Sequence, residues 1–411
     1  MKKKLLVYSD CYIYGGSERL MSFLLGNEIL NSEYSLSFAY RTHSIYRNGM
    51  EKDFSKLNVK LLPLKLLSND TFFYNVKNNL QSRFLVSMIK IPFLLFYYTG
   101  FYSIYNSIVL SKLLIRHRPD IIHINNGGFP AARTCNLLAF VAYFFKIDCV
   151  VYQVNNQAQK ARFVDFARNR FLNKVVDKFI TSSMMARNTL SKNVGIDLEK
   201  IGLVRNIVSV QKSLLNKNLV LDEFSLEKDT FLLVQVAFLT ERKGQIYLLK
   251  ALRQLLNDRK IDKKVCLLLI GDGEDKDKLQ RFCIDNDLDR NVKFLGYKMN
   301  YTEYMNAADM VILPSIMNED LPLVIIEALM LGKCILSTSL AGIAEVVENE
   351  ESGILISPSI ETIQAELYEK VKRFILHPQE MEKISTNAFE RSKIFSSVVY
   401  GNTLKKIYNG E

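Results

Sequence analysis

The alternation of short apolar runs with helix-length segments constrains the fold of this chain more than any other feature of its sequence. A strand, a helix and a second strand in this order build a parallel sheet with helices on both faces. The alternation occurs in both halves, so we predict an α/β protein with two parallel-sheet domains. The predicted strands are Leu5–Ser9, Ile121–Ile124, Cys149–Gln153, Phe179–Ser182, Phe231–Val236, Val265–Gly271, Val292–Gly296, Met310–Pro314 and Cys334–Thr338, and predicted helices include Glu18–Leu30, Gln245–Leu256 and Asp275–Asn286.

The length of the chain fits two domains. Its 411 residues exceed what one hydrophobic core usually organises, and the strand–helix pattern thins near residues 205–228. Apolar residues make up 48% and charged residues 24%, which is typical of a folded protein and excludes a disordered or fibrous chain. We predict a first domain over residues 1–205 and a second over residues 206–392.

Charge is divided unevenly between the two halves. Residues 1–210 carry 28 Lys and Arg against 13 Asp and Glu, whereas residues 211–411 carry 26 against 30. A basic half indicates an anionic partner. No nucleic-acid-binding motif accompanies this charge, so we expect no nucleic acid partner and take the anionic face of a membrane as the candidate surface.

Residues 91–110 form a stretch of 20 residues without a charged side chain. The stretch is long enough to span a bilayer, but Pro92, Gly100, Asn106 and its tyrosines weaken that interpretation. We favour a buried core helix. An aromatic-rich helix in the membrane interface is the alternative, and a membrane span ranks third.

The first residues imitate a secretion signal, because Lys2, Lys3 and Lys4 precede an apolar run. That run is too short for export and ends at Asp10, so we predict a first strand instead. The six cysteines lie mostly in apolar runs and form no Cys-x-x-Cys pair, which favours a reducing, cytoplasmic compartment. The four histidines are scattered, so no His/Cys metal site is predicted.

The segment from Glu319 to Glu327 carries the most specific chemical signal. A helix is predicted from Leu321-Pro322 to about Leu331, with Asp320 as its candidate N-cap and Gly332 after its end. The N-terminus of a helix can hold a phosphate, because it exposes N–H groups and a partial positive charge. Glu327 is a lone carboxylate in an apolar helix, and a ribose diol or a structural ion partner would satisfy it equally well.

In its full context this segment resembles the family 4 retaining glycosyltransferases. The resemblance covers nearly the whole chain. Its blocks are Gly15-Gly16-Ser17-Glu18-Arg19, Pro119-Asp120-Ile121-Ile122-His123, Arg205-Asn206-Ile207, Lys243-Gly244, Gly271-Asp272-Gly273, Val292-Lys293-Phe294-Leu295-Gly296-Tyr297, the region from Pro314 to Gly332, and Ser337–Glu345.

The resemblance implies the GT-B fold, in which two Rossmann-like parallel-sheet domains face each other across a cleft. It implies an acceptor domain over 1–205, joined by a C-terminal helix at about 393–411, and a nucleotide-sugar donor domain over 206–392. The implied activity is retaining, metal-independent transfer of a sugar from a nucleotide-diphosphate sugar, without a cofactor. The implied acceptor is a lipid-linked glycan of bacterial-type surface polysaccharide synthesis (capsule, O-antigen or exopolysaccharide). Such an enzyme would be cytoplasmic, with the inner face of the cell membrane as a candidate docking surface.

The resemblance also implies roles for individual residues. Glu327 would hold the donor ribose hydroxyls, Glu319 would face the donor sugar near its anomeric carbon, and Lys243 would neutralise the departing diphosphate. His123 is a candidate catalytic residue, although a lone histidine at a strand end is more often a core residue. The other implied donor-binding residues are Gly15, Gly16, Arg242, Gly271, Gly273, Tyr297, Leu321, Pro322 and Leu323.

Four positions depart from the family pattern. Phe238 or Ala237 stands where the family usually carries an arginine, and Arg242 is the candidate replacement. Asp320 stands in place of the usual glycine, where it can serve as a helix cap. Asn125 and Asn155 stand where histidines often occur. Asparagine can hydrogen-bond but cannot shuttle a proton at neutral pH.

Three other functions fit parts of the pattern. A nucleotide-sugar epimerase of the same fold would consume donor without an acceptor. A nicotinamide dehydrogenase would need the Gly-x-Gly-x-x-Gly spacing, which the turn at Gly15-Gly16 lacks. A nucleotide-sugar-binding protein with a degenerate catalytic site would explain Phe238 and Asn125.

Overall fold

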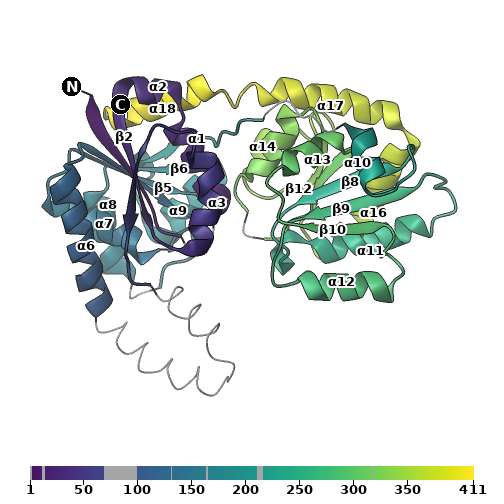
Figure 1. Ribbon diagram of the computed structural model, residues 1–411, viewed down its shortest axis with the longest axis horizontal. Helices are drawn as coiled ribbons and strands as arrows, with labels where there is room; N and C mark the ends of the chain where they lie inside the picture. Colours follow the sequence, from purple (N-terminus) through teal and green to yellow (C-terminus); the bar gives the residue numbers. More distant parts are fainter. Residues whose placement is uncertain are drawn as a thin grey trace, which may run out of the picture. The chain divides into compact units, whose positions relative to one another are not determined.

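The structure is a computed structural model that describes residues 2–11, 14–68, 100–130, 132–162, 165–210, 216–317 and 319–411. It divides into two compact units (Figure 1). Unit 1 consists of Met1–Arg205 and Ser397–Glu411, and unit 2 consists of Asn206–Ser396. Each unit contains one parallel sheet flanked by helices, which confirms the predicted α/β class.

Unit 1 is built on a seven-stranded sheet with the order β3-β2-β1-β4-β5-β6-β7. Its central strands β1 and β4 are almost entirely buried, as expected where helices cover both faces of a parallel sheet. The strands are β1 (Lys3–Ser9), β2 (Tyr34–Arg41), β3 (Lys60–Leu64), β4 (Ile121–Asn126), β5 (Cys149–Val154), β6 (Lys178–Thr181) and β7 (Ile201–Leu203). The helices are α1 (Gly16–Leu25), α2 (Glu28–Glu33), α3 (Ser44–Phe54), α6 (Phe101–His117), α7 (Arg133–Phe144), α8 (Phe166–Val175), α9 (Met184–Val194), the short η2 (Leu198–Lys200) and α18 (Ser397–Tyr408).

The segment Glu18–Leu30, predicted as one helix, forms two. Gly26 ends α1, and Asn27 begins α2 by accepting a hydrogen bond from the Leu30 N–H at 3.2 Å. Short polar side chains favour such caps because they satisfy N–H groups that a helix leaves unpaired. The Asn27 amide also donates to the Ser397 carbonyl at 2.8 Å, which ties α2 to α18.

His123 holds the C-terminal helix against the sheet of unit 1. Its side chain is fully buried in β4, where Nε2 donates to Oε1 of Gln153 at 2.8 Å and Nδ1 accepts from the Tyr408 hydroxyl of α18 at 2.8 Å. Burial lowers the pKa of His123 to about 4, so the ring is neutral at neutral pH. This geometry favours the core role that the sequence left as an alternative to catalysis.

The uncharged stretch 91–110 lies only partly within the described residues. Residues 91–99 fall outside them, and the remainder leads into α6. Tyr102 and Leu110 of α6 are buried, whereas Ile104 and Ile108 are exposed, so this part of the stretch belongs to the core along one face only. No helix within the described ranges has both the length and the apolar character needed to cross a bilayer.

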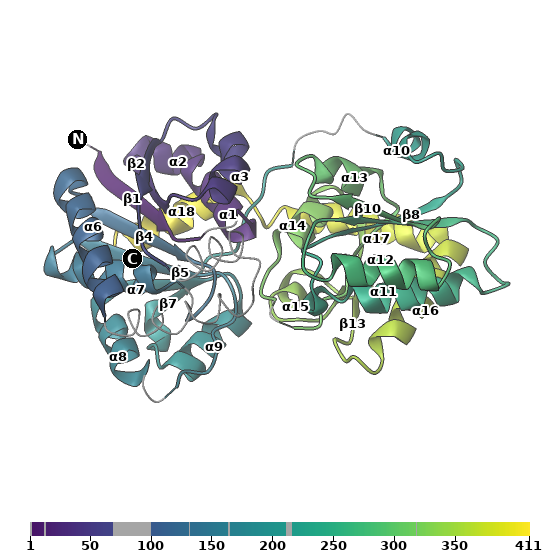
Figure 2. The same cartoon turned by 60° about the horizontal axis from the view of Figure 1, so that its bottom comes forward.

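Unit 2 is built on a six-stranded sheet with the order β10-β9-β8-β11-β12-β13. Figure 2 shows this unit with β8, β10 and β13 labelled. The strands are β8 (Phe231–Val236), β9 (Val265–Ile270), β10 (Val292–Gly296), β11 (Met310–Leu313), β12 (Cys334–Thr338) and β13 (Ile354–Ile356). The helices are α10 (Lys217–Glu223), the 3-10 helix η3 (Glu241–Lys243), α11 (Gln245–Leu256), α12 (Lys276–Asp285), α13 (Tyr301–Ala307), α14 (Leu323–Met330), α15 (Ile343–Val346), α16 (Ile363–Leu376) and α17 (Pro378–Ser392).

Gly244 allows the turn after β8 to pack against the turn after β11. Its φ is +71°, and a Cβ at this position would lie 1.9 Å from the carbonyl oxygen of Pro314. No other residue type fits there without moving the backbone. Gly244 directly follows Lys243, so this close approach also fixes where the lysine lies.

We expect the pH dependence of stability to reveal the buried His123. The unfolded chain takes up a proton at this histidine below about pH 6.5, whereas the folded chain does so only near pH 4, so wild-type stability falls between these values. The loss from this residue is about 3 kcal/mol. His123→Gln should therefore flatten the decline in urea-unfolding free energy between pH 7 and pH 4.5. The exposed His377→Gln serves as the control, and parallel declines in wild type and His123→Gln would contradict the assignment.

We expect Gly244→Ala to destabilise unit 2 more than Gly296→Ala does. Both glycines have positive φ, but a Cβ on Gly296 would meet nothing within 4 Å. The control should lose about 1–2 kcal/mol from backbone strain alone. Gly244→Ala should lose at least about 2 kcal/mol more, because the turn must open. Guanidinium unfolding measures both, and equal losses would argue against the close packing.

Candidate active site

The carboxyl edge of the unit 2 sheet brings together loops that are far apart in the sequence. The Ile316 N–H donates to the Arg242 carbonyl at 2.9 Å, which joins the loops after β11 and β8. The Thr338 hydroxyl at the end of β12 donates to the Ser315 carbonyl at 2.6 Å. Ligands of open α/β sheets bind at this edge, so these loops form the candidate site.

A buried ion pair between Lys243 and Glu319 lies at the centre of this edge. The Lys243 ammonium contacts Oε1 of Glu319, and the side chains of Arg242 and Ser315 approach the same oxygen at 3.3 and 3.0 Å. Lys243 is 8% exposed and Glu319 is 5% exposed. The structure therefore unites the three charged residues that the sequence assigned to the diphosphate and the donor sugar.

Two opposing effects act on the Lys243 ammonium. Burial lowers the pKa of Lys243, and the Glu319 carboxylate acts in the opposite direction. Gln235 from β8 also holds the backbone here, because its amide donates to the Lys243 carbonyl at 3.0 Å. The cation is thus fixed at both its backbone and its ammonium group.

Glu327 has a partner that the sequence did not reveal. The carboxylate is fully buried in α14, and the Tyr301 hydroxyl from α13 lies 2.8 and 2.9 Å from its two oxygens. Tyr301 stands 26 residues before Glu327, and no motif in the sequence marks it. A charged group at this depth requires such hydrogen bonds.

Helix α14 begins later than predicted. Its first residue is Leu323, with Pro322 in the N-cap position, so Asp320 is not the N-cap and Pro322 does not occupy the first turn. Asp320 is instead buried in the preceding loop, with 1% of its surface exposed. The Leu321 carbonyl accepts a hydrogen bond from the Asn206 amide at 3.0 Å, which anchors the chain just before the helix.

Gly271 and Gly273 pack the loop after β9 against the loop after β8. A Cβ on Gly271 would lie 2.0 Å from the Ala237 oxygen, and one on Gly273 would lie 2.3 Å from the Leu239 oxygen. These contacts account for the glycines by backbone packing. Phe238 and Tyr297 are 45% and 60% exposed in the same region, so their side chains are accessible.

The remaining predicted residues belong to unit 1. Gly15 is the N-cap of α1 and Gly16 its first residue, at the carboxyl end of β1. The Asn155 amide donates to Asn125 at 2.6 Å, and the Asn125 amide donates to the Ser9 hydroxyl at 3.1 Å. The two asparagines that replace the family's histidines are therefore neighbours in one hydrogen-bonded row.

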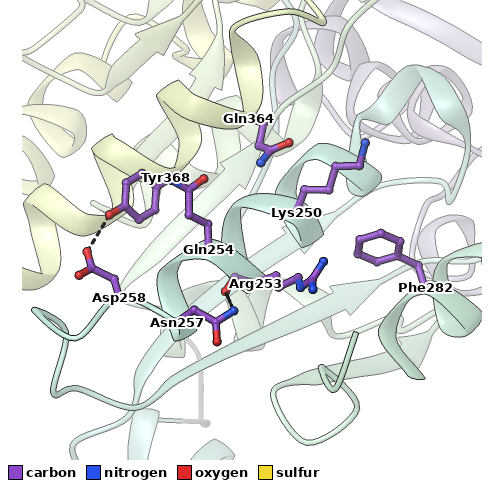
Figure 3. A pocket seen from close by; sticks show the side chains of 8 residues that line it. All are labelled: Lys250, Arg253, Gln254, Asn257, Asp258, Phe282, Gln364 and Tyr368. Atoms are coloured by element: carbon purple, nitrogen blue, oxygen red, sulfur yellow. Dashed lines mark hydrogen bonds between the residues drawn. The ribbon is translucent and has the colours of Figure 1, made fainter. Parts of the chain in front are cut away.

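A separate pocket of about 740 Å³ lies among α11, α12 and α16 of unit 2 (Figure 3). It contains none of the predicted site residues and is lined by residues of these helices and of the segment directly after α11. Its carboxylate Asp258 is engaged with Lys372 and the Tyr368 hydroxyl, both at 2.6 Å, and these contacts hold the pKa of Asp258 well below its usual range. The lining residues are Lys250, Arg253, Gln254, Asn257, Asp258, Phe282, Gln364 and Tyr368.

Most of the second half of the chain matches a known protein family. Residues 219–391 match the family described as glycosyl transferases group 1. This range contains Lys243, Glu319 and Glu327, as well as all six strands of unit 2.

Proteins with named activities are similar to this chain over part of their own length. The UDP-Gal:alpha-D-GlcNAc-diphosphoundecaprenol alpha-1,3-galactosyltransferase of Escherichia coli is 26% identical over 61% of this chain and 65% of its own. The amylovoran biosynthesis glycosyltransferase AmsK of Erwinia amylovora is 31% identical over 30% of this chain and 31% of its own. The matched segments span less than two thirds of either relative.

Solved structures are similar over nearly the full length. The crystal structure of HepE from Anabaena in complex with UDP has a TM-score of 0.74 at 18% identity and covers 99% of this chain and 100% of its own. This similarity establishes the fold and confirms the GT-B prediction. Residues 219–391 therefore match the glycosyl transferases group 1, and the chain carries the GT-B fold.

Proposed function

We propose that this protein transfers a sugar, with retention of its anomeric configuration, from a nucleotide-diphosphate sugar bound by unit 2 to an acceptor bound by unit 1. The observation that carries the proposal is the buried pair of Lys243 and Glu319, joined by the partly exposed Arg242, at the carboxyl edge of the unit 2 sheet. Two cations and a carboxylate converge there, close in sequence to the start of α14. The side chains thus offer positive charge for a diphosphate and one carboxylate for a sugar.

The proposed reaction breaks the bond between the anomeric carbon and the diphosphate oxygen and joins that carbon to the oxygen of an acceptor hydroxyl, whose proton passes to the departing diphosphate. Negative charge grows on the departing diphosphate, and fixed cations at that point lower the barrier. Lys243 and Arg242 supply this charge, so the proposal includes no divalent metal and no cofactor. Ser315 orients Glu319 through its hydrogen bond at 3.0 Å.

The relatives narrow the substrates that we propose. The E. coli relative is named for UDP-Gal and a diphosphoundecaprenol-linked acceptor, and the HepE structure contains UDP. We infer a UDP-sugar donor and a lipid-linked glycan acceptor in surface polysaccharide synthesis. The protein would then work in the cytoplasm at the inner face of the cell membrane, with no nucleic acid partner.

We propose that the acceptor side is a neutral hydrogen-bonding surface. Asn125 and Asn155 present amides at the carboxyl edge of the unit 1 sheet, close to the turn at Gly15 and Gly16. Amides suit sugar hydroxyls because they donate and accept hydrogen bonds. The nearby Glu18 is buried, and burial raises the pKa of its carboxyl group.

The donor site is tested by substitution at Lys243. UDP should raise the melting temperature of the wild type, since a ligand bound only by the folded state stabilises it. Lys243→Ala should lower the rate of UDP-sugar hydrolysis and transfer by about 10²–10³-fold, because it removes one stabilising cation. Glu319→Ala should reduce the same rates.

The control is Lys278→Ala, which removes an exposed lysine of α12 in the same unit. Rates are measured with UDP-galactose and UDP-glucose, and circular dichroism checks that each variant is folded. Unchanged turnover in both site variants would end the proposal. Product NMR tests retention, and formation of an epimeric nucleotide sugar without transfer would indicate an epimerase.

The contact between Tyr301 and Glu327 suggests which side chain the donor ribose displaces when it binds. Glu327 is fully buried while the Tyr301 hydroxyl lies against both of its oxygens. If the carboxylate holds the ribose diol, the ribose hydroxyls take the place of this phenol. Tyr301 then keeps the buried charge hydrogen-bonded until the donor arrives.

We expect Tyr301→Phe to lower stability without ligand and to strengthen UDP binding. The variant loses a hydrogen bond to a charged group, worth about 1.5–3 kcal/mol, and the ribose no longer competes with it. The matched control is Tyr304→Phe on the same helix, whose hydroxyl lies 3.1 Å from Glu223 instead. Calorimetry should show at least about fivefold tighter UDP binding for Tyr301→Phe alone. Weaker binding would instead assign Tyr301 a role in positioning Glu327.

A further inference from the structure

Helix α6 carries a second apolar face that does not pack on its own sheet. Ile104, Ile108 and Ile115 are 62%, 50% and 57% exposed, and their spacing places them on one side of the helix. The opposite side contributes Leu110, Leu113 and Leu114 to the core of unit 1, so the exposed stripe is additional to the packing face. The stripe borders an open groove of about 490 Å³ lined by Ser103, Ile104, Ser107, Ile108, Ser111, Lys112 and Ile115.

Aromatic side chains are also exposed on the next two helices. Figures 1 and 2 show α6, α7 and α8 side by side, and α7 packs against both neighbours. The Tyr143 ring of α7 lies 5.8 Å from the Phe171 ring of α8. We name the exposed apolar set the α6–α8 surface, which comprises Ile104, Ile108, Ile115, Tyr143, Phe144, Phe145 and Phe166.

Apart from histidine, all ionisable Lys, Arg, Asp or Glu positions within these three helices are Lys or Arg. Helices α6, α7 and α8 contain no Asp or Glu, and Asp165 just before α8 pairs with Arg168 at 2.9 Å. Within these helices the exposed aliphatic and aromatic groups therefore lie among basic side chains and no acidic ones. The basic residues are Lys112, Arg116, Arg133, Arg168, Arg170 and Lys174.

We propose that the α6–α8 surface docks on an anionic lipid bilayer. Exposed apolar side chains flanked by Lys and Arg are the combination that binds in the headgroup region, where rings and aliphatic groups enter the acyl boundary and cations meet phosphates. A second copy of this chain fits poorly, because a two-fold interface would place basic helices against each other. A nucleic acid also fits poorly, because its phosphate backbone offers no apolar surface to the exposed isoleucines.

This inference rests on the proposed function, because an enzyme that uses a lipid-linked acceptor must reach that acceptor at a bilayer. The docking residues lie on helices of unit 1, the unit to which we assign the acceptor. None of them takes part in the Lys243–Glu319 cluster of unit 2. Docking and donor binding can therefore be lost separately.

Vesicle co-sedimentation of the full chain tests the proposal. Wild type should bind vesicles of equal parts phosphatidylglycerol and phosphatidylcholine, with weaker binding at higher salt and little binding to pure phosphatidylcholine. Ile104→Ser/Ile108→Ser should lower the partition coefficient by at least about tenfold. Lys112→Gln/Arg116→Gln should lower it by at least about fivefold for the anionic vesicles.

The controls are Ile284→Ser and Lys278→Gln/Arg281→Gln, which remove exposed apolar and basic groups from α12 of unit 2. Both should bind vesicles as wild type does. All variants should keep the melting-temperature shift caused by UDP, which shows that they are folded and separates this proposal from the donor site. Equal binding to both vesicle types, or wild-type binding by the α6 variants, would overturn it. If UDP does not raise the melting temperature of the wild type, this result contradicts the proposed donor site and not the membrane docking.

Discussion

The buried pair of Lys243 and Glu319 is the interaction on which the proposed site depends. Two charges taken out of water are tolerated only if they remain together and hydrogen-bonded. The pair joins loops that follow β8 and β11, so both loops must keep one arrangement. Gly244 makes this arrangement sterically feasible, because a Cβ there would collide with the Pro314 carbonyl oxygen. The same side chains offer a diphosphate a cationic site that is already assembled.

The two units offer different chemistry at the carboxyl edges of their sheets. The edge of unit 2 is ionic, with Lys243, Arg242 and Glu319 in contact. The edge of unit 1 includes a row of neutral amides from Gln153, Asn155 and Asn125, and His123 adjoins this row from within the core. A charged edge suits a diphosphate, whereas neutral amides suit hydroxyl groups. This contrast agrees with a donor on unit 2 and an acceptor on unit 1, as we propose.

Part of the excess positive charge of the first half lies on three neighbouring helices of unit 1. Helices α6, α7 and α8 carry basic residues without carboxylates and expose apolar groups beside them. Cations alone would indicate any polyanion. Cations together with exposed isoleucines and aromatic rings indicate an amphipathic interface. The described part of the uncharged stretch therefore serves both the core and the surface.

The sequence by itself determined the α/β class and the buried strands. β8, β10 and β12 have the predicted bounds. β8 and β12 are mainly apolar runs, as expected of buried strands, whereas β10 is a half-buried edge strand that contains Lys293. β2 was not predicted, since Ser35 and Ser37 interrupt its apolar pattern. Only the tertiary structure decided the partners of the polar residues. Lys243 meets Glu319 across 76 positions and His123 meets Tyr408 across 285, and such contacts depend on how the strands are ordered in the sheet and not on spacing along the chain.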